Sequence, residues 1–316
     1  MDQPDVVTTE VYDTGYRRRR NRMLLYFGIV TVIVAISIGT YFAVDNKKDD
    51  GNKTAQSEAL LRELSSVMTS KGLDASRLSV STSYQAKAMQ WVLDTDKLIL
   101  EDKATLLQRF TLACLYYATN DVITLYTDTA VSWRDSKGWL SADSECTWLG
   151  VQCSSKGNVN GITLESNSMT GALPKELMIL ADHITSLSFT SNLLYMVGDD
   201  FDVFDKLPRL ETLLIDDNYM STTDGLPSSF KSLVSLKKLR MSYNLLGGEL
   251  SNDMVKSWPK LTHLEIESNF LSGSLPSALG HMDQLIYLYM RRNSITSNLN
   301  FLKTGKMENL CKSFLS

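Results

Sequence analysis

A nine-residue pattern returns six times between Val159 and Asn300 and constrains the fold of this chain more than any other feature. Its form is Leu-x-x-Leu-x-Leu-x-x-Asn, and Val, Ile, Phe or Met replaces some of the leucines. Successive asparagines are separated by 25, 26, 26, 25 and 24 residues. The six asparagines are Asn167, Asn192, Asn218, Asn244, Asn269 and Asn293. A spacing this regular indicates six copies of one structural unit.

Each copy predicts one short strand followed by a turn. Apolar residues two apart, such as Ile162 and Leu164, lie on the same face of a strand. One copy cannot bury that face alone, so neighbouring copies must stack it into a continuous core. The asparagine amide can satisfy backbone groups at the turn, which otherwise cost about 1–3 kcal/mol each when buried. We therefore predict an α/β leucine-rich-repeat solenoid of six repeats over residues 159–300, with parallel strands on its concave face.

Composition and motifs argue against nucleic-acid binding and against catalysis. The 316 residues are 43% hydrophobic, which suffices for a core, and their formal charge of −4 gives no basic footprint for nucleic acid. The sequence lacks a zinc-protease, nucleophile-elbow, phosphate-loop or kinase motif. Glu265 and Glu267 share one face, as a glycosidase pair would, but on a flat sheet such a pair is more often solvated charge. We predict a non-enzymatic protein without cofactor or metal.

An uncharged segment, Met23 to Val44, predicts a membrane anchor. Its 22 residues would span roughly 33 Å as a helix at ~1.5 Å per residue, which matches a hydrocarbon core of about 30 Å. A cleavable signal peptide would have a shorter apolar region and a small-residue cleavage site. We therefore predict one transmembrane helix over residues 23–44, in contact with the lipid bilayer.

Charges beside this segment predict its orientation. Five arginines precede it, at positions 17–20 and 22, whereas Lys47 and Lys48 follow it. Basic residues favour the cytoplasmic side, so residues 1–22 become a short cytoplasmic tail of a signal-anchor protein. The arginine run could instead bind anionic lipid or nucleic acid. The rest of the chain would be extracellular or lumenal, with the plasma membrane as the expected location. Asn52 begins an Asn-Lys-Thr glycosylation sequon on that side.

The segments between anchor and repeats predict a stalk and a cap. Residues 45–83 are interpreted as a stalk or linker, with a short amphipathic helix over residues 54–69. Helical patterns resume at Tyr84 and again over residues 104–116, so residues 84–158 are predicted to form a helical N-terminal cap on the first repeat. Residues 301–316 contain apolar side chains but no paired cysteines, which predicts a poorly capped C-terminal end.

A more specific resemblance begins at Cys146, where the sequence Cys-Thr-Trp-Leu-Gly-Val-Gln-Cys leads into the first repeat. The motif resembles the N-terminal cap of plant-type leucine-rich-repeat receptors, as do Thr170-Gly171-Ala172-Leu173-Pro174 and Ser272-Gly273-Ser274-Leu275-Pro276 behind two repeats. The resemblance implies a disulfide between Cys146 and Cys153 and packing of Trp148 on the first repeat. Together with the anchor, the run from Tyr84 to Val92 is similar to leucine-rich-repeat receptor-like proteins of diatoms.

The cysteines link this resemblance to the compartment. A disulfide requires an oxidising environment, which agrees with the predicted orientation, whereas two reduced thiols beside a tryptophan would require the opposite topology. Cys114 has apolar neighbours at helical spacing and is predicted to be a small core residue. Six stacked strands separate it from Cys311 by some 25 Å, and disulfide Cα atoms lie within about 7 Å, so these two cannot pair in one molecule. Cys311 could link two chains.

The exposed strand positions provide the candidate binding face. They change from small and polar in the first repeats, through acidic in the middle, to aromatic and cationic at the end. Tyr and Arg often dominate interfaces, although exposed strand positions are polar in any solenoid. The candidate residues are Asp216, Asp217, Arg240, Tyr243, His263, Glu265, Glu267, Tyr287, Tyr289, Arg291 and Arg292.

These features predict a membrane-anchored recognition module with a receptor-like or co-receptor role. Its partner would be a protein, peptide or glycan, and its short tail would require a signalling partner in the membrane. A different class also remains open, namely an extracellular enzyme inhibitor or an adhesion protein that binds wall material without signalling.

Overall fold

The computed structural model describes residues 50–95, 103–120, 122–123 and 130–296. The predicted tail, anchor and C-terminal end, with Cys311, lie outside these ranges. Within them, no helix is long and apolar enough to cross a bilayer. The chain divides into two compact units at Glu58 and Ala59, and the second unit holds the cap and the repeats. Asn52 belongs to the first unit and lies in helix α2 (Asp50–Ser70), which continues into the second.

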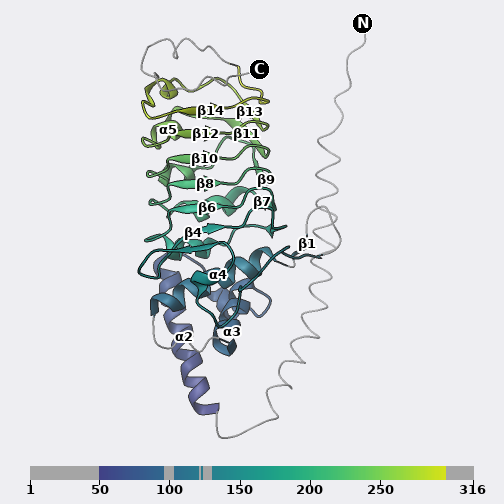
Figure 1. The fold of residues 1–316 in the computed structure, drawn as a ribbon, viewed down its shortest axis with the longest axis vertical. Coiled ribbons are helices and arrows are strands. Elements are labelled where there is room, and N and C mark those ends of the chain that lie inside the picture. Colours follow the sequence, from purple (N-terminus) through teal and green to yellow (C-terminus); the bar gives the residue numbers. More distant parts are fainter. Residues whose placement is uncertain (1–49, 96–102, 121, 124–129, 297–316) are drawn as a thin grey trace. The chain divides into compact units, whose positions relative to one another are not determined.

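The repeats form a solenoid in which every repeat adds one strand to a single sheet (Figure 1). We call one repeat, from strand to strand, a coil. Six parallel strands follow one another in sequence order, and β3 (Val151–Cys153) closes the sheet antiparallel to β4 at the cap end. The six are β4 (Val159–Thr163), β6 (Ser186–Ser188), β8 (Thr212–Leu214), β10 (Lys238–Arg240), β12 (His263–Glu265) and β14 (Tyr287–Tyr289). The predicted parallel sheet is confirmed.

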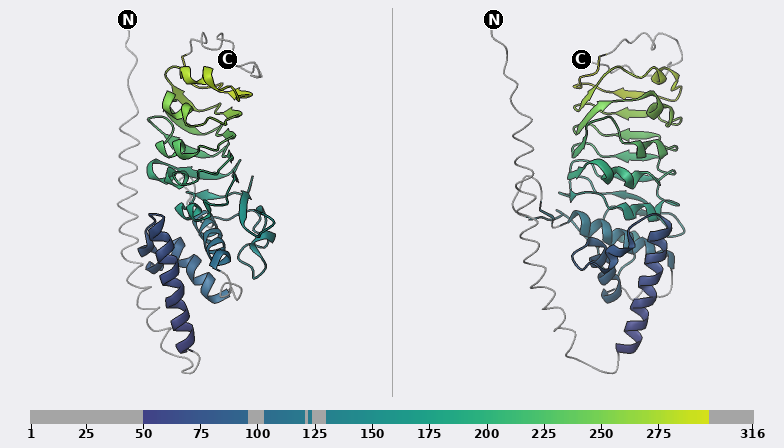
Figure 2. Two further views of the ribbon diagram at one scale, coloured as in Figure 1. Left: turned by 90° about the vertical axis from the view of Figure 1, so that its left-hand side faces the viewer. Right: turned by 180° about the vertical axis from the view of Figure 1, so that it is seen from behind.

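A second sheet of five strands and a row of short helices complete the coils (Figure 2). The strands are β5 (Thr170–Gly171), β7 (Leu193–Met196), β9 (Tyr219–Thr222), β11 (Leu245–Glu249) and β13 (Phe270–Ser272). The helices are η4 (Lys175–Leu180), η5 (Gly198–Phe204), η6 (Ser228–Ser232), α5 (Asn252–Lys256) and η7 (Ser277–His281). The second repeat lacks the Gly-x-Leu-Pro motif, yet its η5 buries Phe201 and Phe204 fully and so maintains the stack.

The repeated leucines and asparagines have the roles that their spacing predicts. The apolar pattern positions are buried in every coil. The side-chain amide nitrogen of Asn218 donates to the backbone oxygens of Phe189 (2.9 Å), Ile215 (3.3 Å) and Asp216 (3.0 Å). Its Oδ1 accepts the Leu194 N–H at 3.0 Å. Each asparagine thereby ties its own turn to the preceding coil, and Asn192, Asn244, Asn269 and Asn293 make the same kinds of bond.

The cap continues this hydrogen-bond ladder beyond the first coil. Asn167 has no preceding coil, and its amide nitrogen donates to the Asp135 carbonyl at 2.9 Å instead. Its Oδ1 accepts the Asp135 N–H at 2.8 Å, and the Arg134 N–H donates to the Asn167 carbonyl. The loop that contains Asp135 therefore occupies the place of an additional coil.

Helices of the cap extend over a longer stretch of sequence than predicted. The predicted helices correspond to α3 (Tyr84–Thr95) and α4 (Lys103–Thr119), and α4 packs on both α3 and η4. However, Leu64 and Met68 of α2 are also fully buried, in the same core as α4. From Ala59 onward the segment interpreted as stalk is thus part of the compact unit. Its apolar spacing reflects packing against the cap.

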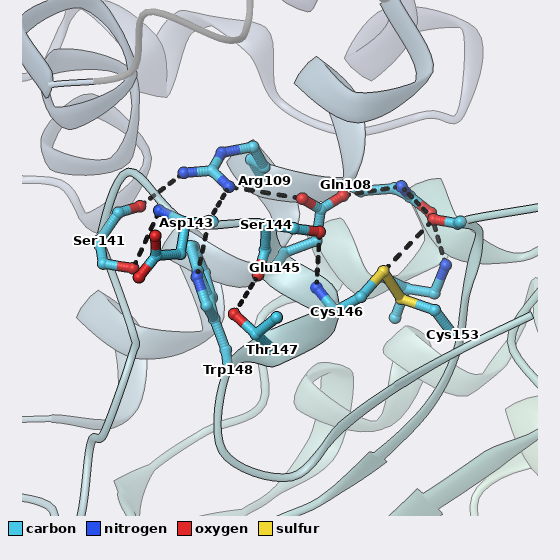
Figure 3. A network of polar contacts seen from close by, with 12 residues as sticks. Gln108, Arg109, Ser141, Asp143, Ser144, Glu145, Cys146, Thr147, Trp148 and Cys153 are labelled. Atoms are coloured by element: carbon cyan, nitrogen blue, oxygen red, sulfur yellow. Dashed lines mark hydrogen bonds and ion pairs between the residues drawn. A yellow bond between two sulfur atoms is a disulfide. The ribbon is translucent and has the colours of Figure 1, made fainter.

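A column of aromatic rings and one buried ion pair lie in the cap, and Figure 3 shows the polar network around the ion pair. The rings of Trp91, Trp148, Trp139, Trp133 and Tyr116 follow one another with centroid distances of 4.8 to 5.8 Å. The Arg109 guanidinium lies 5.3 Å from the Trp91 centroid and 5.0 Å from that of Trp148. Trp148 is 2% exposed, and these ring contacts are with cap residues, so its implied packing on the first repeat stays a prediction.

Arg109 itself is completely buried, and its charge is balanced by neighbours from a distant loop. Its guanidinium donates to the backbone oxygens of Asp143 (2.8 Å) and Ser141 (2.6 Å) and pairs with the Glu145 carboxylate at 3.4 Å. Gln108 donates to the same carboxylate at 2.9 Å and accepts the Val159 N–H at 2.6 Å, so the network reaches the first strand of the solenoid.

The implied disulfide is present between Cys146, in the short helix η3 (Glu145–Thr147), and Cys153, the last residue of β3 (Figure 3). The bridge closes a loop with a sequence separation of 7 residues. For a loop of that size, the chain-entropy model gives a stabilisation of about 2.5 kcal/mol. Cys114 is a buried free thiol, as predicted.

We expect the double replacement Cys146→Ser/Cys153→Ser to lower the free energy of unfolding of the cap by about 2.5 kcal/mol, because the unfolded loop regains its freedom. Urea unfolding followed by tryptophan fluorescence measures this change. Adding a reductant should destabilise the unmodified chain similarly and should leave the double variant unchanged. A reductant effect of equal size on the variant would contradict this explanation.

A second buried polar cluster joins the cap to the first coil. The Glu176 carboxylate of η4 accepts hydrogen bonds from the Tyr84 hydroxyl (2.9 Å) and from Gln85 Nε2 (3.0 Å). Burial raises the pKa of Glu176 above its ordinary value, although these two hydrogen bonds act in the opposite direction. Burial also raises the pKa of Tyr84 and of the nearby Cys114.

This shift predicts a pH dependence of stability. Because the folded chain binds the Glu176 proton more tightly than the unfolded chain, the contribution of Glu176 to the free energy of unfolding should be most favourable below pH 4.5. It should then fall as the pH rises from 4.5 through the raised pKa. Glu176→Gln removes that fall, so the variant should gain stability relative to the unmodified chain between pH 4 and pH 7. Urea unfolding at both pH values measures the gain. If the two proteins differed in free energy of unfolding by the same amount at pH 4 and pH 7, the raised pKa of Glu176 would be contradicted.

Candidate ligand-binding face

The outward residues of the six parallel strands form three rows across the coils. Strand register places Ser186, Thr212, Lys238, His263 and Tyr287 side by side in the first row. It places Ser188, Leu214, Arg240, Glu265 and Tyr289 in the second row. The third row follows two residues later and contains Asp216, Glu267 and Arg291. We call this surface the strand face, and it corresponds to the predicted concave face.

Three charged side chains link the middle coils of the strand face. Arg240 Nε lies 3.0 Å from Asp216 Oδ2 of one neighbouring coil and 3.3 Å from Glu265 Oε2 of the other. The other Asp216 oxygen accepts the Ser242 N–H at 2.9 Å. Burial raises the pKa of Asp216, and the Arg240 charge and the Ser242 bond partly oppose that rise. Arg240 therefore pairs with two carboxylates of the acidic middle predicted from the sequence, Asp216 and Glu265.

Aromatic side chains cover the last two coils of the face. His263 and Tyr287 have ring centroids 4.5 Å apart, and Tyr287 stacks on Tyr289 at 6.3 Å with an interplanar angle of 11°. The Thr262 hydroxyl lies 2.8 Å from His263 Nδ1. Burial lowers the pKa of His263, and Lys238 lowers it further. A neutral imidazole thus continues the aromatic surface towards the exposed Arg291 and Arg292.

The position before each asparagine differs from the prediction, because its backbone leaves the strand. These residues have positive φ values between 51° and 56° in all six coils: Ser166, Ser191, Asp217, Tyr243, Ser268 and Arg292. Left-handed backbone is rare for non-glycine residues and is worst for β-branched ones, and none of the six is β-branched. Asp217, Tyr243 and Arg292 were predicted on the concave face. The structure places them three residues beyond the ends of β8, β10 and β14, where the chain turns.

Asp217 and Tyr243 line a depression that the sequence analysis missed. This lateral groove has a volume of about 550 Å³ and runs beside the first four coils. Its lining is Arg134, Ser166, Ser168, Ser191, Asn192, Leu193, Asp217, Asn218, Tyr219, Tyr243, Asn244 and Leu245. The repeat pattern could have predicted this groove. The residues before and after each asparagine recur with the same period, so they must lie on one side of the stack.

Metal-binding side chains do not cluster on the candidate face in the part of the chain that the structure describes. No cluster of three or more His, Cys, Asp or Glu residues in that part could hold a metal ion. Glu265, one member of the carboxylate pair considered above, is paired with Arg240. The side chains of this face can stack on aromatic groups, pair with charges and form hydrogen bonds.

Comparisons with known proteins agree with this architecture. The family described as Leucine Rich Repeat matches residues 260–282. From Arabidopsis thaliana, "Receptor-like protein kinase BRI1-like 3" is 28% identical over 187 residues, which cover 57% of this chain and 15% of that protein. "Pollen receptor-like kinase 2" from the same plant is 31% identical over 150 residues, covering 47% of this chain and 22% of its own length.

Among solved structures, the leucine-rich-repeat ectodomain of the Arabidopsis receptor kinase HAESA, in complex with an IDA peptide hormone ligand, matches with a TM-score of 0.50. The two are 29% identical, and the match covers 56% of this chain and 29% of HAESA. The chain therefore has the repeat fold of plant leucine-rich-repeat receptor-like proteins and is similar to them in sequence. It spans less than a quarter of the length of the two curated relatives above.

Proposed function

We propose that this chain is a non-enzymatic recognition module, anchored in a membrane, whose strand face binds an extracellular protein or peptide. The observation that carries the proposal is the composition of that face. Its centre is fixed by the Asp216–Arg240–Glu265 ion pairs, and its far end presents stacked rings beside arginine. Aromatic rings next to cations are the groups that most often dominate protein interfaces. The peptide ligand of the similar HAESA ectodomain supports a peptide as one class of partner.

The predicted location follows from sequence and disulfide together. The Cys146–Cys153 bridge favours an oxidising compartment, and the arginines before residue 23 favour a cytoplasmic N-terminus. We therefore propose that residues 23–44 span the membrane and that Asn52 can carry a glycan outside the cytosol.

Surface crosslinking tests the binding role. The full chain is displayed on cells, treated with a membrane-impermeant crosslinker and recovered with its partners. We expect the recovered amount of one or more partners to fall at least fivefold with Tyr287→Thr/Tyr289→Thr. The control variant Lys231→Ser/Lys256→Ser, on the opposite side, should leave that amount unchanged. A membrane protein among the lost partners supports the receptor-like role, whereas a soluble hydrolase or wall polymer supports an inhibitor or adhesion protein. Equal recovery with both variants would refute binding through the strand face.

Topology is tested separately. We expect glycosidase treatment to shift the mobility of the unmodified chain and to leave Asn52→Gln unchanged. Protease added outside sealed vesicles of inverted orientation should digest only the N-terminal tail. Digestion of the repeats from the cytoplasmic side would place them in the cytosol and would overturn the proposed location.

A further inference from the structure

Two neighbouring coils depart from the regular spacing of the solenoid. In three coils the helix starts eight residues after the asparagine, at Lys175, Asn252 and Ser277. In the second coil, η5 starts only six residues after Asn192, and in the third coil η6 starts ten residues after Asn218. One helix therefore starts early and its neighbour starts late, so the two coils do not match each other behind their strands.

This mismatch leaves a pocket between the two coils. Strand β7 ends at Met196, which pairs with Met220 of β9. Strand β9 continues to Thr222, and among the described pairings Ser221 and Thr222 have partners in β11 but none in β7. The resulting space, which we call the junction pocket, has a volume of about 430 Å³ and is lined by η5, by the end of β9 and by the start of η6. A volume of this size suits a small molecule.

Carboxylates from both coils line the junction pocket, and two of them lack a cation. Asp202 pairs with Lys175 at 3.0 Å. Asp199 forms no ion pair or hydrogen bond within the described ranges, and Asp224 accepts only the Thr223 hydroxyl there, at 3.2 Å. Both Asp199 and Asp224 are exposed. The pocket thus presents two negative charges to a ligand, one from each coil.

A buried hydroxyl in the same lining has no partner. Ser229 is 5% exposed, and its Oγ is buried without a hydrogen bond. Buried polar groups are nearly always hydrogen-bonded, so this hydroxyl indicates a partner that the described residues do not supply. Val197 and Pro227 add apolar surface to the lining, and Val197 is 54% exposed. The pocket therefore combines negative charge, a free hydrogen-bonding group and an apolar wall.

We propose that the junction pocket binds a small aliphatic polyamine. Asp199 and Asp224 pair with its ammonium groups, and Val197 and Pro227 contact its methylene groups. The Ser229 hydroxyl accepts one of its N–H groups. The inference goes beyond the proposed function, because the pocket lies outside the strand face and would bind a polyamine even if that face bound nothing.

Two other classes of ligand fit this lining less well. A metal ion is disfavoured, because no group of three or more His, Cys, Asp or Glu in the described ranges could hold one. A neutral sugar usually needs an exposed ring to stack on. Phe201, the aromatic residue of the lining, is fully buried and offers no such face. An ammonium ligand instead satisfies both free carboxylates.

Isothermal titration calorimetry with spermidine and the purified full chain in neutral detergent tests the inference. We expect saturable binding that is about fivefold or more tighter than that of diacetylated spermidine, which lacks both terminal ammonium groups. The amide of acetyl-lysine presents a single ammonium and should also bind more weakly. Equal affinity for all three compounds, a tighter interaction with the lysine derivative, or displacement of spermidine by an equal concentration of calcium would overturn the proposal.

Three variants assign the binding to the junction pocket. Asp199→Asn and Asp224→Asn should each weaken spermidine binding about fivefold, because each removes one negative charge. Asp283→Asn, at an exposed position outside the pocket, should leave the affinity unchanged.

Ser229→Ala separates a ligand contact from a structural role. Because the Ser229 hydroxyl has no partner in the free chain, its removal should weaken spermidine binding about threefold without lowering the free energy of unfolding in urea. Unchanged affinity in Asp199→Asn, Asp224→Asn and Ser229→Ala, or an equal loss in Asp283→Asn, would overturn the proposal.

Discussion

Replacing Arg109 by leucine is expected to lower the free energy of unfolding by about 3–5 kcal/mol, because it leaves a buried carboxylate without its cation. Glu145 is 3% exposed and would retain only the Gln108 hydrogen bond among the contacts described above. The backbone oxygens of Ser141 and Asp143 would also lose donors. Leucine cannot replace the cation–π contacts with Trp91 and Trp148.

Tryptophan fluorescence measures this effect where it occurs. Of the five tryptophans, four belong to the cap and only Trp258 lies in the repeats. Coils of a solenoid contact only their neighbours, so urea unfolding of the cap can be followed separately from distant coils. Arg209→Leu, a matched change at an exposed position, should alter stability by less than about 0.5 kcal/mol.

A double variant separates the ion pair from general packing. Arg109→Leu/Glu145→Leu removes both charges, and we expect it to recover part of the stability lost in Arg109→Leu, because no uncompensated carboxylate remains. If Arg109→Leu cost less than about 1 kcal/mol, the buried pair would not hold the cap together. A double variant less stable than Arg109→Leu would assign the loss to packing.

The repeats could be predicted from the sequence because their physical constraint is periodic. A buried leucine and a turn asparagine recur every 24–26 residues, and each recurrence reports the same contacts. The hydrogen bonds of Asn218 are those expected for an amide at the turn. The disulfide was implied by a resemblance, and the structure shows it.

The cap interior could not be predicted in this way, because its contacts occur once. Arg109 lies between Gln108 and Phe110 in a helical sequence where a charge is normally solvated, and its partner Glu145 is 36 residues away. No local pattern connects the two. The stalk was misplaced for a related reason, since Leu64 and Met68 at helical spacing are equally consistent with an isolated amphipathic helix and with a cap element.

The candidate site was predicted in part. Strand register brings His263, Tyr287 and Tyr289 together as the alternation of side chains requires. Asp217 and Tyr243 were assigned to the same face because the strand was assumed to continue up to the asparagine. The strands β8 and β10 end three residues before Asp217 and Tyr243, whose left-handed backbone belongs to the turn, and both residues line the lateral groove. A turn conformation that many residue types can adopt leaves a weak signal in a sequence.

Asn218→Ala is expected to lower the free energy of unfolding by about 3 kcal/mol, because one amide satisfies several buried backbone groups at once. The change deprives the carbonyls of Phe189, Ile215 and Asp216 of a donor and the Leu194 N–H of its acceptor. Asn160→Ala is the matched control. Asn160 lies on β4, and its side-chain amide makes no hydrogen bond within the described ranges. It should cost less than about 1 kcal/mol.

Asn218→Asp distinguishes lost hydrogen bonds from lost volume, since the two side chains have nearly the same shape. An ionised carboxylate cannot donate, and it would face the three carbonyl oxygens that the amide now satisfies. We therefore expect Asn218→Asp to be less stable than Asn218→Ala at pH 7. Its pKa would be raised in the folded chain, so the variant should regain stability as the pH falls towards 4, whereas Asn218→Ala should not. Urea unfolding of both variants at pH 7 and pH 4 measures the difference, and parallel behaviour of the two would show that the asparagine only fills space.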